Sequence, residues 1–288
     1  FYLHLSVQLK RTLVLPRVRL LRRMKGAGVR FHPVAEYARY ADLFNTSALS
    51  KLHPVIELDD FLKLPHDGPP ISLLTRIYFK GCPDEGAGER KFNGHKAVGY
   101  GRLQCAGQLQ YDPDALKQLS DRSIGFVDSV DQLQASQVAP LRPYVRFEQG
   151  VYDEAASFAA ERFGGEPFIA LHWRRTDFLA MRATQPGVLQ SARDLVRHAR
   201  ALLQAHGAKH VYLATDCDDA DELALVEEAL KPVRYAVDRG KLFARARSAN
   251  VEIALCAMAS GFLGTTTSSF TLAITEERAS VFGHAPHT

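Results

Sequence analysis

The second half of the chain alternates short apolar runs with longer segments that carry apolar residues on one helical face. Each apolar run has the length of a buried strand, and each longer segment has the period of an amphipathic helix. Strands that alternate with helices at this spacing predict an α/β fold with a doubly wound parallel sheet. The predicted strands are 167–173, 210–216, 233–237 and 261–265, and the predicted helices are 186–207, 218–232, 248–261 and 268–280.

The first half of the chain mixes short apolar strands with irregular loops. A helical pattern at 148–165, which Gly164 and Gly165 end, marks the junction between the halves. We therefore expect two domains, 1–155 and 156–288. The strands predicted in the first domain are 12–16, 29–34, 53–58 and 71–79.

Two of the predicted helices carry terminal signals. Asp219 and Glu222 have the spacing of a capping box at the start of the helix 218–232. Gly261 follows the helical pattern 248–261 and is expected to close it.

Composition is that of a globular protein, with 46% hydrophobic and 24% charged residues in a chain of 288. No apolar run approaches the roughly 20 residues that cross a bilayer. The net charge of +4 suits an anionic ligand but does not imply nucleic acid. The chain starts in mid-pattern at Phe1, so we expect a natural segment before it.

The cysteines divide into two pairs. Cys217 and Cys256 lie within apolar segments, which is typical of buried free thiols. Cys82 and Cys105 bracket a polar, Gly-rich stretch, and a disulfide there would stabilise it by roughly 3 kcal/mol. The sequence leaves the bridged and unbridged states equally open. Asn45 begins an Asn-Thr-Ser triplet that fits the N-glycosylation pattern.

Polar side chains follow three of the predicted strands where each strand ends. His172, Arg174 and Asp177 lie at the end of the first strand, Asp216 ends the second, and "GTTTSSF" (264–270) links the last strand to a helix. Ligands bind outside the carboxyl ends of such strands, and a helix start offers N–H groups to anions. Cations beside a helix start predict a phosphate or diphosphate site.

Each of these residues also has a structural explanation. His172 suits a satisfied, half-buried imidazole, Arg174 and Asp177 an ion pair, Asp216 a helix cap, and the hydroxyl run an ordinary loop. Their joint placement at one sheet edge favours a binding site. No Gly-x-Gly-x-x-Gly or Gly-Lys-Ser/Thr loop follows a strand, which disfavours the common dinucleotide and P-loop sites.

Three ordered blocks resemble the GDP-fucose-dependent protein O-fucosyltransferases, most closely the type that modifies thrombospondin type repeats. The blocks are "ALHWRRTDF" (170–178), "VYLATD" (211–216) and "FLGTTTSSFTLAITEER" (262–278), and "RTLVLP" and "GRLQCAG" extend the likeness into the first half. The resemblance implies a GT-B-like fold, with two Rossmann-like domains facing across a cleft. In that arrangement 1–155 lies on the acceptor side and 156–288 binds the GDP-sugar.

The resemblance also implies an activity. It predicts an inverting transfer of fucose from GDP-fucose to a Ser or Thr hydroxyl of a small, folded, disulfide-rich repeat. No metal and no cofactor beyond the donor substrate are expected, and the reaction is expected in the lumen of the endoplasmic reticulum.

The family motifs assign roles to several residues. By position, His172 contacts the nucleotide and Arg174 holds the diphosphate and stabilises the leaving group. Ser268, Ser269 and Phe270 provide phosphate contacts through hydroxyl and backbone N–H groups.

Glu252 falls where the family has an aspartate that reads guanine. A carboxylate can accept both the ring N–H and the exocyclic amine of guanine, and a glutamate places that acceptor pair about one methylene further out. Asp177 is expected to orient Arg174. No residue of the chain is assigned as general base, because the family's segment with the candidate base would precede Phe1.

Two other functions stay open on the sequence. The Arg-Arg-Thr-Asp run also suits fucosyltransferases that act on a glycan. A GDP-binding pseudoenzyme or quality-control protein would bind donor and repeat without releasing fucose. Nucleic-acid binding has the weakest support, since a basic run at 17–25 is its only feature.

Overall fold

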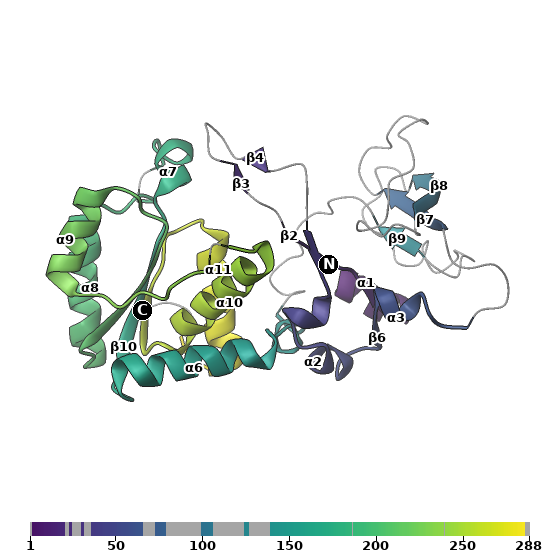
Figure 1. Ribbon diagram of the computed structural model, residues 1–288, viewed down its shortest axis with the longest axis horizontal. Helices are drawn as coiled ribbons and strands as arrows, with labels where there is room; N and C mark the ends of the chain where they lie inside the picture. Colours follow the sequence, from purple (N-terminus) through teal and green to yellow (C-terminus); the bar gives the residue numbers. More distant parts are fainter. Residues whose placement is uncertain are drawn as a thin grey trace. The chain divides into compact units, whose positions relative to one another are not determined.

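A computed structural model shows the chain as two compact units (Figure 1). The amino-terminal unit comprises Phe1–Arg19 and Tyr37–Arg146, and the carboxyl-terminal unit comprises Leu20–Glu36 and Phe147–Thr288. The boundary expected between 155 and 156 falls within helix α6 (Gln149–Phe163). The structure describes residues 2–20, 23–24, 30–31, 36–65, 73–78, 99–105, 124–126, 139–185, 187–238 and 240–285.

The amino-terminal unit is built from short elements. Strands β1 and β6 pair in parallel, and β7 lies between β8 and β9 in a second parallel sheet. Strands were therefore correctly predicted within 12–16, 53–58 and 71–79. The elements are α1 (Tyr2–Leu9), β1 (Leu13–Leu15), β5 (Glu36–Ala38), η1 (Tyr40–Asp42), α2 (Thr46–Ser50), β6 (Val55–Glu57), α3 (Leu58–Phe61), β7 (Leu73–Tyr78), β8 (Gly99–Cys105), β9 (Ile124–Phe126) and η3 (Arg142–Tyr144).

A small apolar core and one buried carboxylate hold this unit together. Leu3, Leu15 and Leu49 pack against one another, so α1, β1 and α2 share the core. Glu57, at the end of β6, accepts a hydrogen bond from the backbone N–H of Ala41 at 2.7 Å. The carboxylate thereby satisfies a donor in the first turn of η1 that has no partner within the helix.

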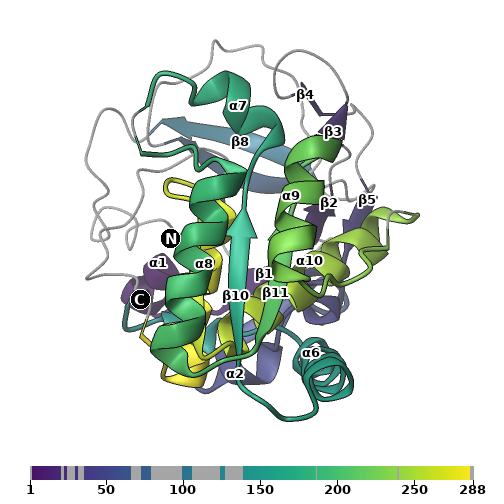
Figure 2. The same cartoon turned by 90° about the vertical axis from the view of Figure 1, so that its left-hand side faces the viewer.

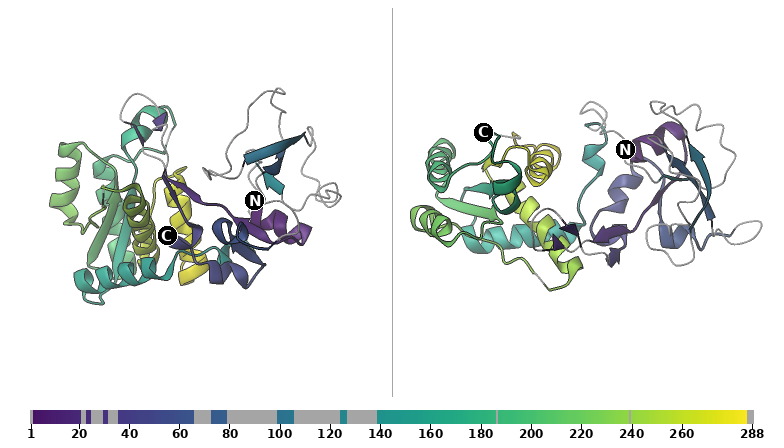
Figure 3. Two further views of the ribbon diagram at one scale, coloured as in Figure 1. Left: turned by 45° about the vertical axis from the view of Figure 1, so that its right-hand side comes forward. Right: turned by 90° about the horizontal axis from the view of Figure 1, so that it is seen from above.

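The carboxyl-terminal unit is a three-layer α/β structure. Its parallel sheet has the order β11-β10-β12, with α8 and α9 on one face and α10 and α11 on the other (Figures 2 and 3). This is the doubly wound sheet that the sequence predicts. Strand β2 (Val18–Leu20) crosses the boundary between the units in sequence. The other elements of this unit are β3 (Arg23–Met24), β4 (Arg30–Phe31), α6, β10 (Phe168–Trp173), α7 (Thr176–Met181), α8 (Ala192–His206), β11 (His210–Thr215), α9 (Ala220–Leu230), α10 (Leu242–Met258), β12 (Gly261–Leu263), α11 (Ser269–Glu277) and η4 (Arg278–Phe282).

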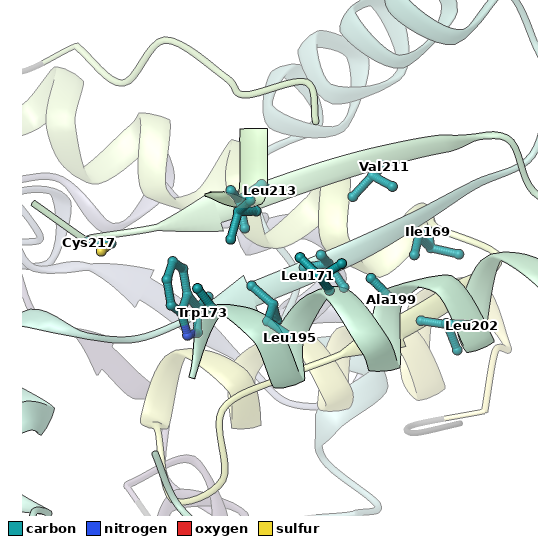
Figure 4. Close-up of a cluster of buried hydrophobic side chains, with 12 residues drawn as sticks. Ile169, Leu171, Trp173, Leu195, Ala199, Leu202, Val211, Leu213 and Cys217 are labelled. Atoms are coloured by element: carbon teal, nitrogen blue, oxygen red, sulfur yellow. The ribbon is translucent and has the colours of Figure 1, made fainter. Parts of the chain in front are cut away.

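The central strand β10 is buried along its whole length, as a strand covered on both faces must be. Its side chains alternate between the two helical layers. Ile169, Leu171 and Trp173 face α8 and join one apolar cluster with Leu195 and Leu202 of that helix (Figure 4). Side chains at the even positions of β10 point to the other face. His172 is one of them, and so it points toward the layer of α10 and α11.

Three predicted elements differ from the structure. The helix expected at 186–207 begins only at Ala192, because the Ser191 side chain caps it by accepting from the Asp194 N–H. The helix expected at 248–261 is α10, which begins at Leu242 and ends at Met258. Gly261 therefore does not close that helix but begins β12.

The strand expected at 233–237 is reduced to one bridge. Val233 pairs in parallel with Tyr212 of β11, and the residues after it leave the sheet. Pro232, directly before Val233, has no N–H to donate, so it cannot extend the pairing toward the amino end.

Candidate functional site

The carboxyl ends of β10, β11 and β12 meet at one edge of the sheet, which we call the carboxyl edge. Arg174 follows β10, Asp216 follows β11 and Thr265 lies two residues beyond β12. An Arg174 guanidinium nitrogen is 2.9 Å from an Asp216 carboxylate oxygen, and the Arg174 backbone N–H donates to Thr265 Oγ1 at 2.9 Å. The three strand ends thus converge as the sequence predicts. Figure 2 shows α7 leaving this edge directly after β10.

His172 is buried between β10 and the first turn of α11. Its Nδ1 is 2.7 Å from Thr271 Oγ1, and its ring packs on Phe270 with centroids 4.8 Å apart. Burial, helped by the neighbouring Arg174 cation and opposed by Asp216, lowers the pKa of His172 to about 4. The imidazole is therefore neutral near pH 7, with one ring nitrogen able to donate and the other able to accept.

Arg174 is held between two carboxylates. Asp177 and Asp216 each place an oxygen 2.9 Å from a guanidinium nitrogen, and the arginine side chain is 27% exposed. The guanidinium has five N–H donors in a fixed plane, so two ion pairs leave donors for a ligand. The carboxylates fix the direction of the fork and offset part of its charge. The ion pair with Asp177 fits both a structural pair and an orienting role, so the orienting role stays a prediction.

Arg175, the next residue, has a structural role. Its guanidinium lies over the Trp173 ring at 5.2 Å and forms an ion pair with Glu222 of α9. It also donates to the Gln190 carbonyl at 3.2 Å, and the residue is only 8% exposed. Arg175 therefore ties the end of β10 to the helices on one face of the sheet.

Asp216 links the two arginines through different atoms. One oxygen accepts the Arg175 backbone N–H at 2.7 Å, and the other contacts the Arg174 guanidinium and the Thr176 hydroxyl. Asp216 does not cap the next helix, because Asp219 caps α9 by accepting from the N–H groups of Asp221 and Glu222.

The capping box expected at α9 is only half formed. The Asp219 side chain serves as the predicted N-cap, but the Glu222 carboxylate is used by Arg175. An ion pair to a buried guanidinium is the stronger interaction, and it takes the carboxylate away from the N-cap N–H.

The turn from β12 to α11 is unusually tight. A Cβ on Gly264 would lie 2.4 Å from Thr271 Cγ2, closer than any real contact, so only glycine fits. Thr267 adopts a positive φ of 66°, and Ser268 then begins the helix as its N-cap. Within the described residues the Ser268 side chain makes no capping bond. The N–H groups of the first turn of α11 therefore remain available at the positive end of the helix dipole.

The predicted phosphate-binding residues lie at this helix start. Ser268 is buried, Ser269 is exposed, and Phe270 packs on the His172 ring. His172 also contacts Thr271, so the start of α11 and the end of β10 are in direct contact. The start of α11 therefore lies against the end of β10, the strand that Arg174 follows.

Glu252 lies on the same face of the sheet but further from the carboxyl edge. It is in α10 and accepts a hydrogen bond from Tyr212 Oη at 3.2 Å. Tyr212 pairs with Ala170, two residues before His172 on β10. Burial and the Glu252 charge raise the pKa of Tyr212 well above its usual value, so its hydroxyl remains a donor. The structure does not place Glu252 in the Arg174 cluster.

The sequence does not single out Thr265, Thr271 or Tyr212, and it assigns Glu222 to a capping box rather than to Arg175. Thr265 and Thr271 lie in the hydroxyl-rich stretch 265–271. Polar residues follow one another there, so no periodicity distinguishes these two threonines from their neighbours. Tyr212 fits its apolar strand, and Glu222 fits its acidic helix start, so neither stands out in the sequence. Only the fold shows which polar atoms they meet.

The other predicted residues have local structural roles or lie outside the described chain. The Asn45 side chain accepts from the Ala48 N–H at 2.9 Å and caps α2. Cys217 and Cys256 are buried free thiols, as predicted. Cys105 ends β8, but Cys82 lies outside the described residues, so their disulfide stays a prediction.

Neither a metal site nor a membrane-spanning helix is found among the described residues. Among them, no three His, Cys, Asp or Glu side chains gather as a metal site would require. None of the helices in this part of the chain combines the length and apolar character that a bilayer span needs.

Comparison with known proteins gives one family. The family model described as "GDP-fucose protein O-fucosyltransferase" matches residues 2–281. "GDP-fucose protein O-fucosyltransferase 2" of Caenorhabditis elegans is 36% identical over 121 residues, which cover 40% of this chain and 26% of the relative. The Homo sapiens protein of the same name is 30% identical over 126 residues, 43% of this chain and 28% of the relative. The alignments thus span little more than a quarter of these relatives.

Solved structures of POFUT1 share the fold. The complex with GDP superposes with a TM-score of 0.75 at 17% identity, covering 99% of this chain and 91% of that one. The complex with GDP-fucose gives a TM-score of 0.73 at 16% identity, with the same coverage. The predicted α/β, GT-B-like fold class is confirmed by this likeness.

Proposed function

Because the chain belongs to the GDP-fucose protein O-fucosyltransferase family, we propose that it transfers fucose from GDP-fucose to a hydroxyl group of a protein. The observation that carries the proposal is the arrangement at the carboxyl edge, where the Arg174 backbone N–H donates to Thr265 in the turn that leads into α11. A cationic fork beside a helix start is suited to a diphosphate, which needs several N–H donors at once.

The reaction breaks the bond between fucose C1 and the β-phosphate oxygen of GDP-fucose. A Ser or Thr Oγ forms the new bond to C1 from the opposite side, which inverts the configuration, and its proton passes to a base that is not assigned. Negative charge develops on the departing GDP. The N–H groups of Arg174 and of the first turn of α11 stabilise that charge as it forms, without a metal ion.

His172 and Glu252 complete the proposed donor site. His172 is neutral, so it donates or accepts a hydrogen bond to the nucleotide without adding charge. Glu252 reads guanine through its two oxygens, with Tyr212 holding one of them. This role requires the nucleotide to reach α10 from the carboxyl edge.

The acceptor and the compartment are proposed from the sequence blocks. Their resemblance to the enzymes that modify thrombospondin type repeats supports a small, disulfide-rich acceptor, and two curated relatives carry the name "GDP-fucose protein O-fucosyltransferase 2". Such repeats are folded in the endoplasmic reticulum, which we propose as the site of action.

Thermal stabilisation by nucleotides tests the donor class. A ligand that binds only the folded state at 100 times its Kd raises the unfolding free energy by about 2.7 kcal/mol. We expect GDP to stabilise the protein more than ADP or UDP. Arg174→Ala removes charge-assisted hydrogen bonds of about 1.5–3 kcal/mol each and should weaken GDP binding at least tenfold.

Arg197→Ala on the exposed face of α8 is the matched control for the loss of an arginine. Unchanged GDP affinity and fucose transfer in Arg174→Ala would move the diphosphate site elsewhere. Glu252→Gln should reduce the preference for GDP over ADP, and Glu228→Gln, at an exposed position of α9, should not. A preference that survives Glu252→Gln would remove Glu252 from the site.

The acceptor is tested by offering a folded thrombospondin type repeat and a glycan side by side with GDP-fucose. Transfer to the repeat supports the proposal. Transfer to the glycan alone indicates a glycan-directed fucosyltransferase. Binding of GDP and repeat without fucose release indicates a pseudoenzyme.

A further inference from the structure

The two residues directly after β10 are held by side chains rather than by neighbouring strands. Pairing with β12 stops at Leu171, which lies opposite Leu263, and pairing with β11 stops at Trp173. The next two N–H groups, of Arg174 and Arg175, are bound by side chains instead. Thr265 Oγ1 accepts the first at 2.9 Å and Asp216 accepts the second at 2.7 Å.

Thr265 forms a bridge with one hydroxyl. Its Oγ1 donates to the His172 carbonyl at 3.0 Å while it accepts from the Arg174 N–H, and the residue is only 4% exposed. The hydroxyl therefore binds the backbone on both sides of Trp173. It spans the two residues, His172 and Arg174, whose side chains form the proposed nucleotide site.

We propose that Thr265 is a positioning residue that fixes the backbone of Arg174 so that its guanidinium meets the donor diphosphate. This inference rests on the proposed function. Asp177 and Asp216 orient the same guanidinium, but each adds a negative charge that opposes a diphosphate. A hydroxyl fixes the residue from its backbone side without that repulsion. Thr265 therefore holds the Arg174 backbone in place without adding a charge that repels an anionic ligand.

Three variants separate the hydroxyl from other properties of the side chain. Thr265→Val keeps the shape but leaves a buried N–H and a buried carbonyl without a partner. Thr265→Ser keeps the bridge. Thr275→Val is the matched control, because Thr275 is also buried, in α11, and its hydroxyl donates to the Leu272 carbonyl at 2.8 Å.

The first measurement is GDP affinity by titration calorimetry. Losing a hydrogen bond of this kind changes an equilibrium by about five- to a hundredfold, so we expect at least fivefold weaker binding in Thr265→Val. Thr265→Ser and Thr275→Val should remain within about twofold of the unaltered protein. Equal affinities for the valine and serine variants at position 265 would overturn the proposal.

The second measurement is hydrogen exchange at the Arg174 amide without nucleotide. Exchange should be faster in Thr265→Val and unchanged in Thr265→Ser and Thr275→Val. Should the valine variant fail to fold, Thr265→Ala makes the same deletion with a smaller side chain, and loss of protection in Thr265→Ser would still contradict the bridge.

The two measurements fail in distinguishable ways. Absence of GDP binding by the unaltered protein would overturn the proposed function, and with it the role of Thr265 in donor binding. Normal GDP binding with unchanged exchange at Arg174 in Thr265→Val would overturn the positioning role alone.

Discussion

A buried histidine that stays neutral makes the stability of the protein depend on pH. The folded-state pKa of His172 is about 4, below the value of about 6.5 for an unfolded chain. The unfolded state therefore binds more protons between these values. Stability from this group is complete above pH 6.5 and is lost as the pH falls toward 4, by roughly 3 kcal/mol in total.

Urea unfolding at several pH values measures this dependence. His172→Asn can keep a hydrogen bond to Thr271 but does not titrate, so its stability should fall less steeply than that of the unaltered protein between pH 6.5 and 4. Parallel curves for the two proteins would contradict a buried neutral imidazole. The comparison cancels the carboxylates and other histidines, which titrate in both.

Arg174 and Arg175 are predicted to divide binding and stability between them. Arg175→Ala removes the partner of Glu222 from a mostly buried ion pair, so we expect a loss of about 3 kcal/mol in unfolding free energy. GDP affinity of the folded variant should change little. Arg174→Ala should instead weaken GDP binding and change the unfolding free energy little. Denaturant unfolding and titration calorimetry measure the two quantities. Equal effects of both substitutions on GDP affinity would contradict the division.

These two arginines also show which side-chain partners can and cannot be predicted from the sequence. The sequence correctly indicated that the ends of β10, β11 and β12 converge, which brings Arg174 to Asp216 and to Thr265. The sequence could not predict that the Arg175 side chain pairs with Glu222. The side-chain directions of consecutive residues after a strand follow no periodicity. Their directions depend on α9, a helix that packs from a distant part of the chain.

The tight turn between β12 and α11 gives a prediction at the scale of elements. Gly264→Ala would place a methyl group against Thr271, whose hydroxyl binds His172. Helix α11 must then shift, and overpacking of this kind costs typically 1–3 kcal/mol. Urea unfolding should show that loss, and GDP binding should weaken as well.

Gly240→Ala is the control, because a Cβ there meets only the end of the Asp238 side chain at 3.1 Å. A stability of Gly264→Ala equal to that of the control would mean that the turn has more room than the structure shows.

The elements themselves could be predicted unevenly. Strands β10 and β11 and helix α6 follow from apolar runs and a glycine stop, since Gly164 adopts the left-handed conformation at φ 62°. Helix α10 begins six residues before its prediction, because "LFARAR" (242–247) has helical propensity but a weak apolar pattern. Helix α7, at six residues, is too short for its periodicity to be read.

At the scale of the molecule, the sequence was most informative about the carboxyl-terminal unit. Its helices alternate with strands that are buried on both faces, which produces a strong and regular pattern. The amino-terminal unit has strands of only three residues in β1, β5 and β6, and short strands give little alternation to detect. Its contribution to the fold became clear through the likeness to POFUT1.

The division into two units predicts where GDP acts. Every described residue of the proposed donor site belongs to the carboxyl-terminal unit, so GDP should slow hydrogen exchange most at 172–177 and 264–272. Amides of β1 and β6, whose core is separate, should exchange at the same rate with and without GDP. Exchange measured by mass spectrometry, with ADP as the control nucleotide, checks this distribution.

Protection centred on β1 and β6 would place the nucleotide in the other unit. Protection confined to the carboxyl edge would mean that one sheet supplies the described part of the donor site, and that acceptor recognition is left to other parts of the protein.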